Sequence, residues 1–134
     1  MLFRYSITTH KADSKHRQAR DFGWAIGNPL IARLVDGKRK GTLGKEMSFA
    51  QVDKQNVLLL TLKQAEDKNG IIIRLIETEG NDVTATITLP HLTIEKAHRT
   101  NIVEENMEEL TFTEHSITAP VKAFGITTIR IQTH

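Results

Sequence analysis

Arg74 and Glu77 are the first residues that invite a chemical interpretation, because both are charged and lie in the apolar segment IIIRLIE at 71–77. An arginine and a carboxylate beside a core strand have the chemistry of a catalytic or ligand-binding pair. Successive side chains of a strand point to opposite faces, however, which places Arg74 on one face and Glu77 on the other. The spacing therefore predicts two separate structural roles. A buried Arg74 would need a carboxylate from a neighbouring strand or from a docking domain, since an unpaired buried charge is costly.

His10, Asp13 and His16 form a local cluster of metal-ligating residue types. A zinc site needs three or four ligands that converge at about 2 Å. Polar residues at this spacing also serve as a helix cap with solvated neighbours, and we prefer that interpretation and assign no metal ligand. The loop from His10 to Asp13 is the candidate wall of a substrate cleft, because polar loops carry function more often than sheet interiors do.

Other catalytic motifs fail on their spacing. The segment GKRKGTLGKE at 37–46 suggests a phosphate loop, but Arg39 stands where the first glycine is required and Glu46 replaces the magnesium-binding Ser or Thr. No serine lies in a GxSxG elbow. The acidic run at 104–109 is interpreted as a solvated face. The residues alone thus predict no catalytic motif.

The composition limits the protein class. A chain of 134 residues is long enough for one domain with its own core. The absence of cysteine excludes disulfides and cysteine-bearing zinc sites. The N-terminus has no apolar signal region and no apolar run is long enough to cross a membrane. We therefore expect a soluble protein, with the cytoplasm favoured, and no membrane partner.

Charge is distributed unevenly along the chain. Residues 1–45 carry ten Lys or Arg against three Asp, a net charge of +7, whereas the remainder carries a net charge of −5. A basic first third is compatible with nucleic-acid or membrane contact. No aromatic residues alternate with these charges in the manner of a nucleic-acid platform, so we prefer a solvated or docking face and expect no nucleic-acid partner.

The N-terminal third should form a strand followed by a helix. Residues 2–9 alternate between apolar and polar side chains, which predicts a half-buried strand. Residues 10–30 have the apolar spacing of a helix, with Asp13 or Ser14 as its cap and Gly27 near its end.

From Met47 onward the pattern changes to short strands separated by turns, and Asn69-Gly70 is a strong hairpin signal. We expect an all-β fold, an antiparallel β-sandwich of about eight or nine strands with one short N-terminal helix. Residues 1–134 are expected to form a single domain, in which a strand–helix extension (1–35) and a loop (36–46) precede the main strands (47–134). The predicted strands are 47–52, 57–64, 71–77, 83–89, 93–103, 110–113, 117–123 and 125–132, and the acidic segment 104–110 is expected to be a turn.

Five segments, in order, resemble the C-terminal region of the family 38 glycoside hydrolases, the retaining α-mannosidases. The strongest is 53–80, in which a strand ending in Lys63 and an acidic turn are followed by Arg74-Leu-x-Glu77. The others are FRYSITTHKAD (3–13), NPL (28–30), NIVEE (101–105) and VKAFGITTIRI (121–131). Ala123, Gly125 and Ile76 depart from the usual residues of the family, which changes local rigidity and packing.

The resemblance implies a β-sandwich domain without catalytic residues of its own. In this family the zinc ligands and both catalytic carboxylates come from an N-terminal α/β domain, so we assign no catalytic residue here and expect zinc in that other domain. Lys63, Arg74 and Glu77 are implied to be structural. The expected partners are the catalytic domain of the same enzyme and, through the full enzyme, mannosides or oligosaccharides. The chain would support the catalytic domain, wall the sugar cleft through His10 and Asp13, and be inactive alone.

A free-standing carbohydrate-binding or interaction module is the alternative. Sugar-binding surfaces usually stack aromatic rings on the sugar, yet aromatic residues make up 5% of this chain. Its one Trp (Trp24) and one Tyr (Tyr5) both lie in the N-terminal third.

Overall fold

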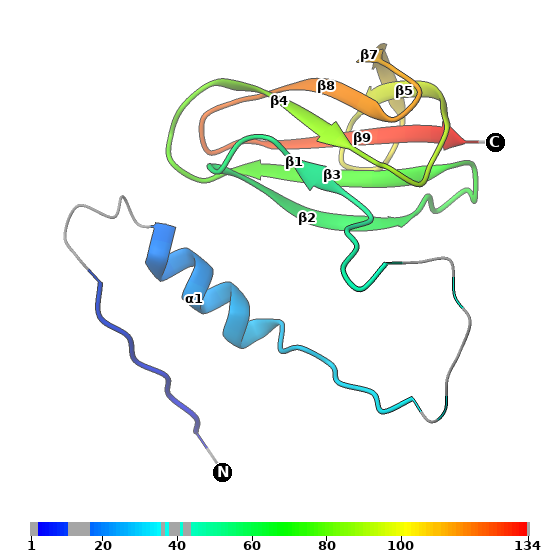
Figure 1. The fold of residues 1–134 in the computed structure, drawn as a ribbon. Helices are drawn as coiled ribbons and strands as arrows, with labels where there is room; N and C mark the ends of the chain where they lie inside the picture. Colours follow the sequence, from blue (N-terminus) through cyan, green and yellow to red (C-terminus); the bar gives the residue numbers. More distant parts are fainter. Residues whose placement is uncertain (1–2, 11–16, 36, 38–40, 42–43, 134) are drawn as a thin grey trace. The chain divides into compact units, whose positions relative to one another are not determined.

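A computed structural model describes residues 3–10, 17–35, 37, 41 and 44–133. The chain divides into two compact units, residues 1–43 and residues 44–134. The assignment of residues 1–134 to a single domain stays a prediction. The described residues form one helix and nine strands, and all of the strands lie in the second unit (Figure 1).

The second unit is an antiparallel β-sandwich, which confirms the predicted fold class (Figure 1). One sheet has the strand order β1-β4-β8-β7, and the other has the order β2-β3-β9-β5-β6. The bounds of the first sheet are β1 (Gln51–Val52), β4 (Val83–Thr88), β8 (Ser116–Val121) and β7 (Thr111–Phe112). Those of the second are β2 (Val57–Gln64), β3 (Ile71–Glu77), β9 (Ile126–Thr133), β5 (Ile94–Thr100) and β6 (Asn106–Glu109).

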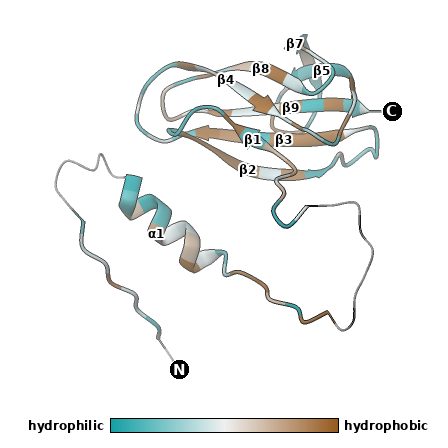
Figure 2. Ribbon diagram, viewed as in Figure 1, coloured by the Kyte–Doolittle hydropathy of each residue, from teal (hydrophilic) through white to brown (hydrophobic). Residues whose placement is uncertain are grey.

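The core lies between the two sheets and follows the alternation of the strands. In the four-stranded sheet Ile87 pairs with Ile117, and in the five-stranded sheet Ile73 pairs with Ile129. These four side chains are fully buried. Figure 2 shows hydrophobic residues concentrated in the strands, with hydrophilic residues in many of the connecting loops. Burial of this apolar surface is the main stabilising contribution to such a fold.

The predicted hairpin at Asn69-Gly70 connects β2 to β3. Gly70 has φ = 99°, a backbone conformation that residues with a side chain rarely adopt. A Cβ atom at this position would lie 2.2 Å from the carbonyl oxygen of Ile131. Glycine is therefore required for the close approach of this turn to β9.

The first unit contains α1 (Arg17–Gly27), which lies inside the predicted helical segment and ends at the predicted glycine. The proposed caps, Asp13 and Ser14, lie outside the described residues. Among the described residues, no helix has the length and apolar character that a membrane span requires.

The prediction of a half-buried strand at 2–9 is wrong for the described residues 3–9, which form no strand. Phe3, Tyr5 and Ile7 are 63%, 84% and 90% exposed. Alternation specifies which side chains share a face, but a strand also needs a neighbour that pairs with its N–H and C=O groups. None of the described strands pairs with residues 3–9.

The prediction of a turn at 104–110 is also wrong, because β6 occupies most of that segment and pairs with β5. All four side chains of β6 are exposed. An edge strand can carry charged residues on solvated positions, which removes the apolar alternation on which strand prediction depends.

Candidate functional site

Three cationic side chains lie on the face of the five-stranded sheet that is turned away from the core. Lys63 pairs across the strands with Ile72, and Ile72 pairs with Arg130, so these residues share one face of the sheet. Arg74 follows Ile72 by two residues on β3 and lies on the same face. Within the described chain this outer face also carries the loop at 101–105, whose Glu104 is 4% exposed.

Glu104 is the anion at the centre of this face. Its Oε1 lies 2.8 Å from Nζ of Lys63 and 3.8 Å from Nη2 of Arg74. Its Oε2 accepts a hydrogen bond of 2.9 Å from the backbone N–H of Glu66. The hydrogen bond from Lys63, followed by that from Glu66, lowers the pKa of the Glu104 carboxyl below its usual value. Glu104 is therefore a carboxylate held by one cation at contact distance and a second nearby.

The backbone at Glu104 is also unusual, with φ = 70°. This conformation is uncommon for residues other than glycine, asparagine and aspartate. Asn101 stabilises the loop, since its Oδ1 accepts hydrogen bonds from the N–H groups of Val103 (3.1 Å) and Glu105 (2.9 Å). The local geometry thus directs the Glu104 side chain under the loop and leaves Ile102 and Val103 exposed.

Arg130 connects the same loop to the β2–β3 hairpin. Its Nη1 donates to Oδ2 of Asp67 at 2.6 Å and to the carbonyl of Asn69 at 3.0 Å. Its Nη2 donates to the carbonyl of Glu104 at 2.7 Å. Arg130 is 6% exposed, and its hydrogen bond lowers the pKa of the Asp67 carboxyl. We call Lys63, Asp67, Arg74, Glu104 and Arg130 the outer-face ion cluster.

Arg74 finds its partners within the chain. Its Nη2 donates to the carbonyl of Ile102 at 2.9 Å, in addition to its proximity to Glu104. The sequence suggested a carboxylate from a neighbouring strand or a docking domain, whereas Glu104 comes from the loop after β5. Lys63 also forms an ion pair with Glu66, and hydrogen bonds to Glu104 and Glu66 raise the Lys63 pKa.

Glu77 lies on the opposite face of β3, as strand alternation predicted, and is 1% exposed. Phe124 donates its N–H to Oε2 of Glu77 at 3.0 Å. Further donors are the N–H groups of Glu79 (2.8 Å), Gly80 (2.7 Å) and Asn81 (3.2 Å), and the side-chain amide of Asn56 (2.7 Å). Burial raises the pKa of Glu77, but these hydrogen bonds outweigh burial and lower the pKa to about 2. Glu77 therefore holds the turn after β3 against the turn before β9.

Neither Glu77 nor Glu104 has the arrangement that acid–base or nucleophilic catalysis requires. General acid–base chemistry needs a titratable group within reach of a substrate atom, and a nucleophile needs an adjacent base. Glu77 and Glu104 instead have their oxygens engaged by protein donors. Among the described residues there is no group of three or more His, Cys, Asp or Glu side chains that suits a metal ion. The described geometry supports a structural role for both carboxylates.

The predicted cleft residues His10 and Asp13 belong to the first unit, whereas Glu77 and the outer-face ion cluster belong to the second. His10 is exposed and lies in the first unit. Asp13 and His16 lie outside the described residues, so the helix-cap and metal interpretations of that loop stay predictions.

Sequence reasoning missed the buried role of Glu104, because the acidic run at 104–109 was interpreted as a solvated face. It also did not single out Arg130 or Asp67. A signal for Arg130 is present in the segment ITTIRIQT of β9, where an arginine stands between isoleucines on a central strand. Such an arginine needs acceptors nearby.

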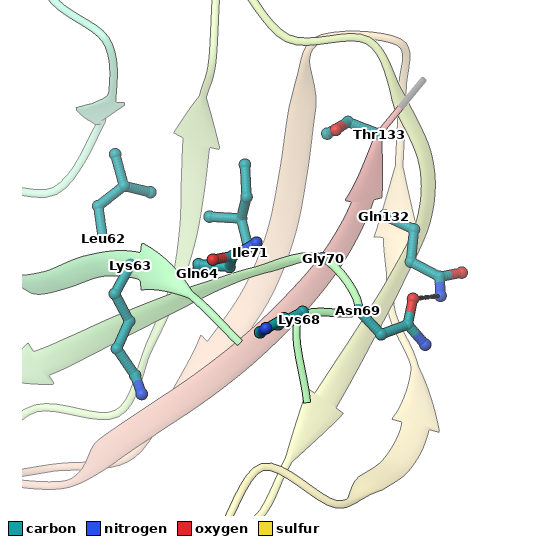
Figure 3. A pocket seen from close by; sticks show the side chains of 9 residues that line it. All are labelled: Leu62, Lys63, Gln64, Lys68, Asn69, Gly70, Ile71, Gln132 and Thr133. Carbon is teal, nitrogen blue, oxygen red and sulfur yellow. Dashed lines mark hydrogen bonds between the residues drawn. The ribbon is translucent and has the colours of Figure 1, made fainter. Parts of the chain in front are cut away.

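Hollows flank the outer-face ion cluster. One of about 320 Å³ is lined by Asp67, Val103, Glu104 and Arg130, among others, and one of about 350 Å³ by Lys63, Arg74, Ile102 and Glu104, among others. The charged groups of the cluster in these walls are paired with one another. A hollow of about 630 Å³ lies at the end of the β2–β3 hairpin and has a different lining (Figure 3).

The sequence of this chain is similar to a known protein family and to a curated relative. The family model described as "Glycosyl hydrolases family 38 C-terminal beta sandwich domain" matches residues 56–129. Alpha-mannosidase G of Dictyostelium discoideum is 22% identical over 133 residues, an alignment that covers 96% of this chain. The chain spans 12% of the length of that relative. The matched range includes Glu77 and also Lys63, Arg74 and Glu104 of the outer-face ion cluster.

Proposed function

The chain belongs to the C-terminal β-sandwich domain family of the family 38 glycosyl hydrolases, and from this premise we propose that it serves as a non-catalytic supporting domain of an α-mannosidase. The observation that carries the proposal is the family match over residues 56–129, the range that contains most of the sandwich. The similarity to alpha-mannosidase G extends this relation to 96% of the chain.

The way in which the sandwich uses its charges is consistent with the proposed supporting role. In the described chain, Glu77 fixes turns at one end of β3, and the outer-face ion cluster fixes the 101–105 loop and the hairpin beyond the other end. Side chains locked by packing and hydrogen bonds make a rigid platform. A rigid platform suits a domain that holds the position of a catalytic domain beside it.

The first unit supplies the surface proposed for docking. Leu30, Ile31 and Leu34 are 101%, 96% and 90% exposed, and Figure 2 shows the segment after α1 as largely hydrophobic. Exposed apolar patches commonly mark interaction sites. The alignment with the much longer relative covers 96% of the chain and so includes most of this unit. We assign this surface to contact with the catalytic part of the enzyme.

Association with the catalytic polypeptide tests the proposed docking. The probe is the polypeptide encoded immediately upstream of this chain, purified and measured for binding by calorimetry. We expect the double change Leu30→Ser with Ile31→Ser to weaken binding at least about tenfold, because burying each aliphatic side chain contributes about 1.5–3 kcal/mol. The matched control is Ile102→Ser with Val103→Ser, two adjacent exposed aliphatic residues of the second unit. Equal losses of binding affinity in the two double variants would show that the first unit is not the specific docking surface.

A finer part of the proposal is that the loop from His10 to Asp13 walls the sugar cleft of the full enzyme. We expect His10→Ala to lower the mannosidase activity of the full-length enzyme more than His115→Ala does. His115 is a suitable control because its Nδ1 lies 2.8 Å from the carbonyl of Leu92, within the sandwich unit. Small and equal effects of the two substitutions would reject the cleft assignment.

We also propose that any zinc ion required for mannoside hydrolysis is held by the catalytic domain. The support is the resemblance to the family, together with the internal pairing of Glu77, Glu104 and Asp67 in this chain. The part of this chain that is described would then contribute position and shape.

A carbohydrate-binding module is the second candidate function. The observation that favours it is the 630 Å³ hollow at the β2–β3 hairpin, which has an amide-rich lining (Figure 3). Binding of a sugar by the isolated chain, without association with a catalytic polypeptide, would support this candidate over the first.

A further inference from the structure

The hollow at the end of the β2–β3 hairpin differs from the hollows beside the outer-face ion cluster in its charge. The described residues that line it include no carboxylate, whereas Glu104 lines both of the others. Its polar groups are the carboxamides of Gln64, Asn69 and Gln132, the hydroxyl of Thr133, and two lysines. Lys63 is already paired with Glu104, so the lining offers amide and hydroxyl groups together with the single cation of Lys68.

Much of this polar capacity is unused within the chain. In the described structure, the side chains of Gln64, Lys68 and Thr133 make no hydrogen bond to another residue. The hydrogen bond of 2.7 Å from Nε2 of Gln132 to Oδ1 of Asn69 leaves Oε1 of Gln132 and Nδ2 of Asn69 available. Figure 3 shows this bond as a dashed line at one side of the hollow. The hollow therefore presents both donors and acceptors.

The hollow is also fixed in shape. The N–H of Asn69 donates to Asp67 at 2.9 Å, and the Asn69 carbonyl accepts from Arg130 at 3.0 Å. A Cβ atom at Gly70 would lie 2.2 Å from the carbonyl oxygen of Ile131, so this turn packs directly against β9. Groups held in place before binding lose less conformational entropy when a ligand arrives.

An apolar surface accompanies part of this polar lining. Gln64 shares a face of the sheet with Leu62 and Ile71, as does Thr133, whereas Lys63 and Gln132 lie on the opposite face. Figure 3 shows the side chains of Leu62 and Ile71 on one side of the hairpin and that of Lys63 on the other. Leu62 is 41% exposed, although it lies on a strand next to the core. Ligand sites typically combine an apolar floor with a few fixed polar groups, and this hollow has a volume within the usual range of a few hundred to about 1,000 Å³.

We propose that this hollow is a binding subsite for a neutral, hydroxyl-rich sugar unit of an oligosaccharide. The carboxamide of Gln64 and the hydroxyl of Thr133 match the mixed donors and acceptors of sugar hydroxyls, and Leu62 and Ile71 on the same side match the C–H face of a pyranose ring. The lysines disfavour a cationic ligand. The subsite follows from the lining alone, whereas the choice of mannose as the first probe rests on the proposed function.

Titration of the ¹⁵N-labelled chain with α-mannotriose, followed by amide spectra, tests the subsite. We expect saturable shifts in the millimolar range at Gln64, Gly70 and Ile71, including the side-chain amide of Gln64. Gln64→Ala should weaken binding about fivefold or more, since one hydrogen bond contributes about 1 kcal/mol. The matched control is Gln51→Ala, an exposed glutamine on the other sheet, which should bind as the unchanged chain does.

A parallel titration with maltotriose separates this inference from the proposed function. Shifts at the same residues with maltotriose but not with α-mannotriose would support the sugar subsite and count against the mannosidase role. Absence of shifts with both sugars at tens of millimolar would overturn the subsite and leave the docking proposal standing. Equal weakening by Gln64→Ala and Gln51→Ala would also overturn it. Unchanged melting temperatures establish that both variants are folded.

Discussion

Glu77→Ala is expected to lower the free energy of unfolding of the sandwich by about 4 kcal/mol. The carboxylate is 1% exposed and accepts hydrogen bonds from the backbone N–H groups of Phe124, Glu79 and Gly80, among others. Alanine would leave these donors without an acceptor in a poorly hydrated place, and each unsatisfied buried donor costs about 1–3 kcal/mol. Part of this cost would be relieved by local opening of the turns. Chemical denaturation followed by circular dichroism measures the change.

The control for this substitution is Glu114→Ala, because the side chain of Glu114 is 70% exposed and contacts only His115 at 3.7 Å among the ion pairs of the described chain. We expect that variant to change the free energy of unfolding by less than about 0.5 kcal/mol. Similar effects of the two substitutions would show that Glu77 does not hold the turns.

Glu77 also predicts a pH dependence with a defined sign. Its pKa falls from the usual 4.5 to about 2 on folding, so the unfolded chain binds this proton more readily than the folded chain. The stabilisation is therefore fully present above about pH 4.5 and is lost as the pH falls toward 2. The difference in stability between the unchanged chain and Glu77→Ala should shrink over that interval. A constant difference from pH 7 to pH 3 would contradict the assignment.

Glu104→Ala is expected to lower the free energy of unfolding by about 3 kcal/mol. Removal of one partner of a buried ion pair costs about 3–5 kcal/mol, and the low end applies here because Lys63 and Arg74 are 30% and 25% exposed and can be partly hydrated. The N–H of Glu66 would also lose its acceptor. Hydrogen exchange should show faster exchange in residues 101–105 and in the β2–β3 hairpin.

Glu108→Ala is the matched control, since Glu108 pairs with Arg99 at 2.5 Å but is 53% exposed. Exposed ion pairs contribute about 0–1 kcal/mol, so this variant should remain close to the unchanged chain. If Glu104→Ala and Glu108→Ala were equally stable, the outer-face ion cluster would have no special structural role. Glu104→Gln, which retains the shape and removes the charge, should fall between the two.

The strands of the sandwich could be predicted because their alternation records which side chains face the core. The opposite faces of Arg74 and Glu77 followed from the same rule, and the hairpin followed from Asn69-Gly70. The partner of Arg74 could not be derived in this way, since Glu104 reaches it from a loop 30 residues later in the chain. The local pattern of apolar and polar residues does not specify contacts between distant segments.

The wrong predictions for residues 3–9 and for Glu104 also arise because local pattern does not specify long-range contacts. Residues 3–9 alternate like a strand, yet they form none in the described structure, where Phe3, Tyr5 and Ile7 are exposed. Glu104 was interpreted as solvated because it begins an acidic run, yet its side chain is buried and its backbone has φ = 70°. A backbone conformation of this kind is set by the surrounding contacts and cannot be predicted from the residue type.

The central claim is that this chain supports an α-mannosidase and does not hydrolyse mannosides by itself. The most direct measurement is the release of the aryl group from an aryl α-mannoside by the purified 134-residue chain, alone and together with the polypeptide encoded immediately upstream. The account predicts no hydrolysis above buffer for the chain alone, and activity in the joint sample that falls when Leu30 and Ile31 are replaced by serine. Hydrolysis by the purified chain alone, co-eluting with it on size exclusion, would contradict the account.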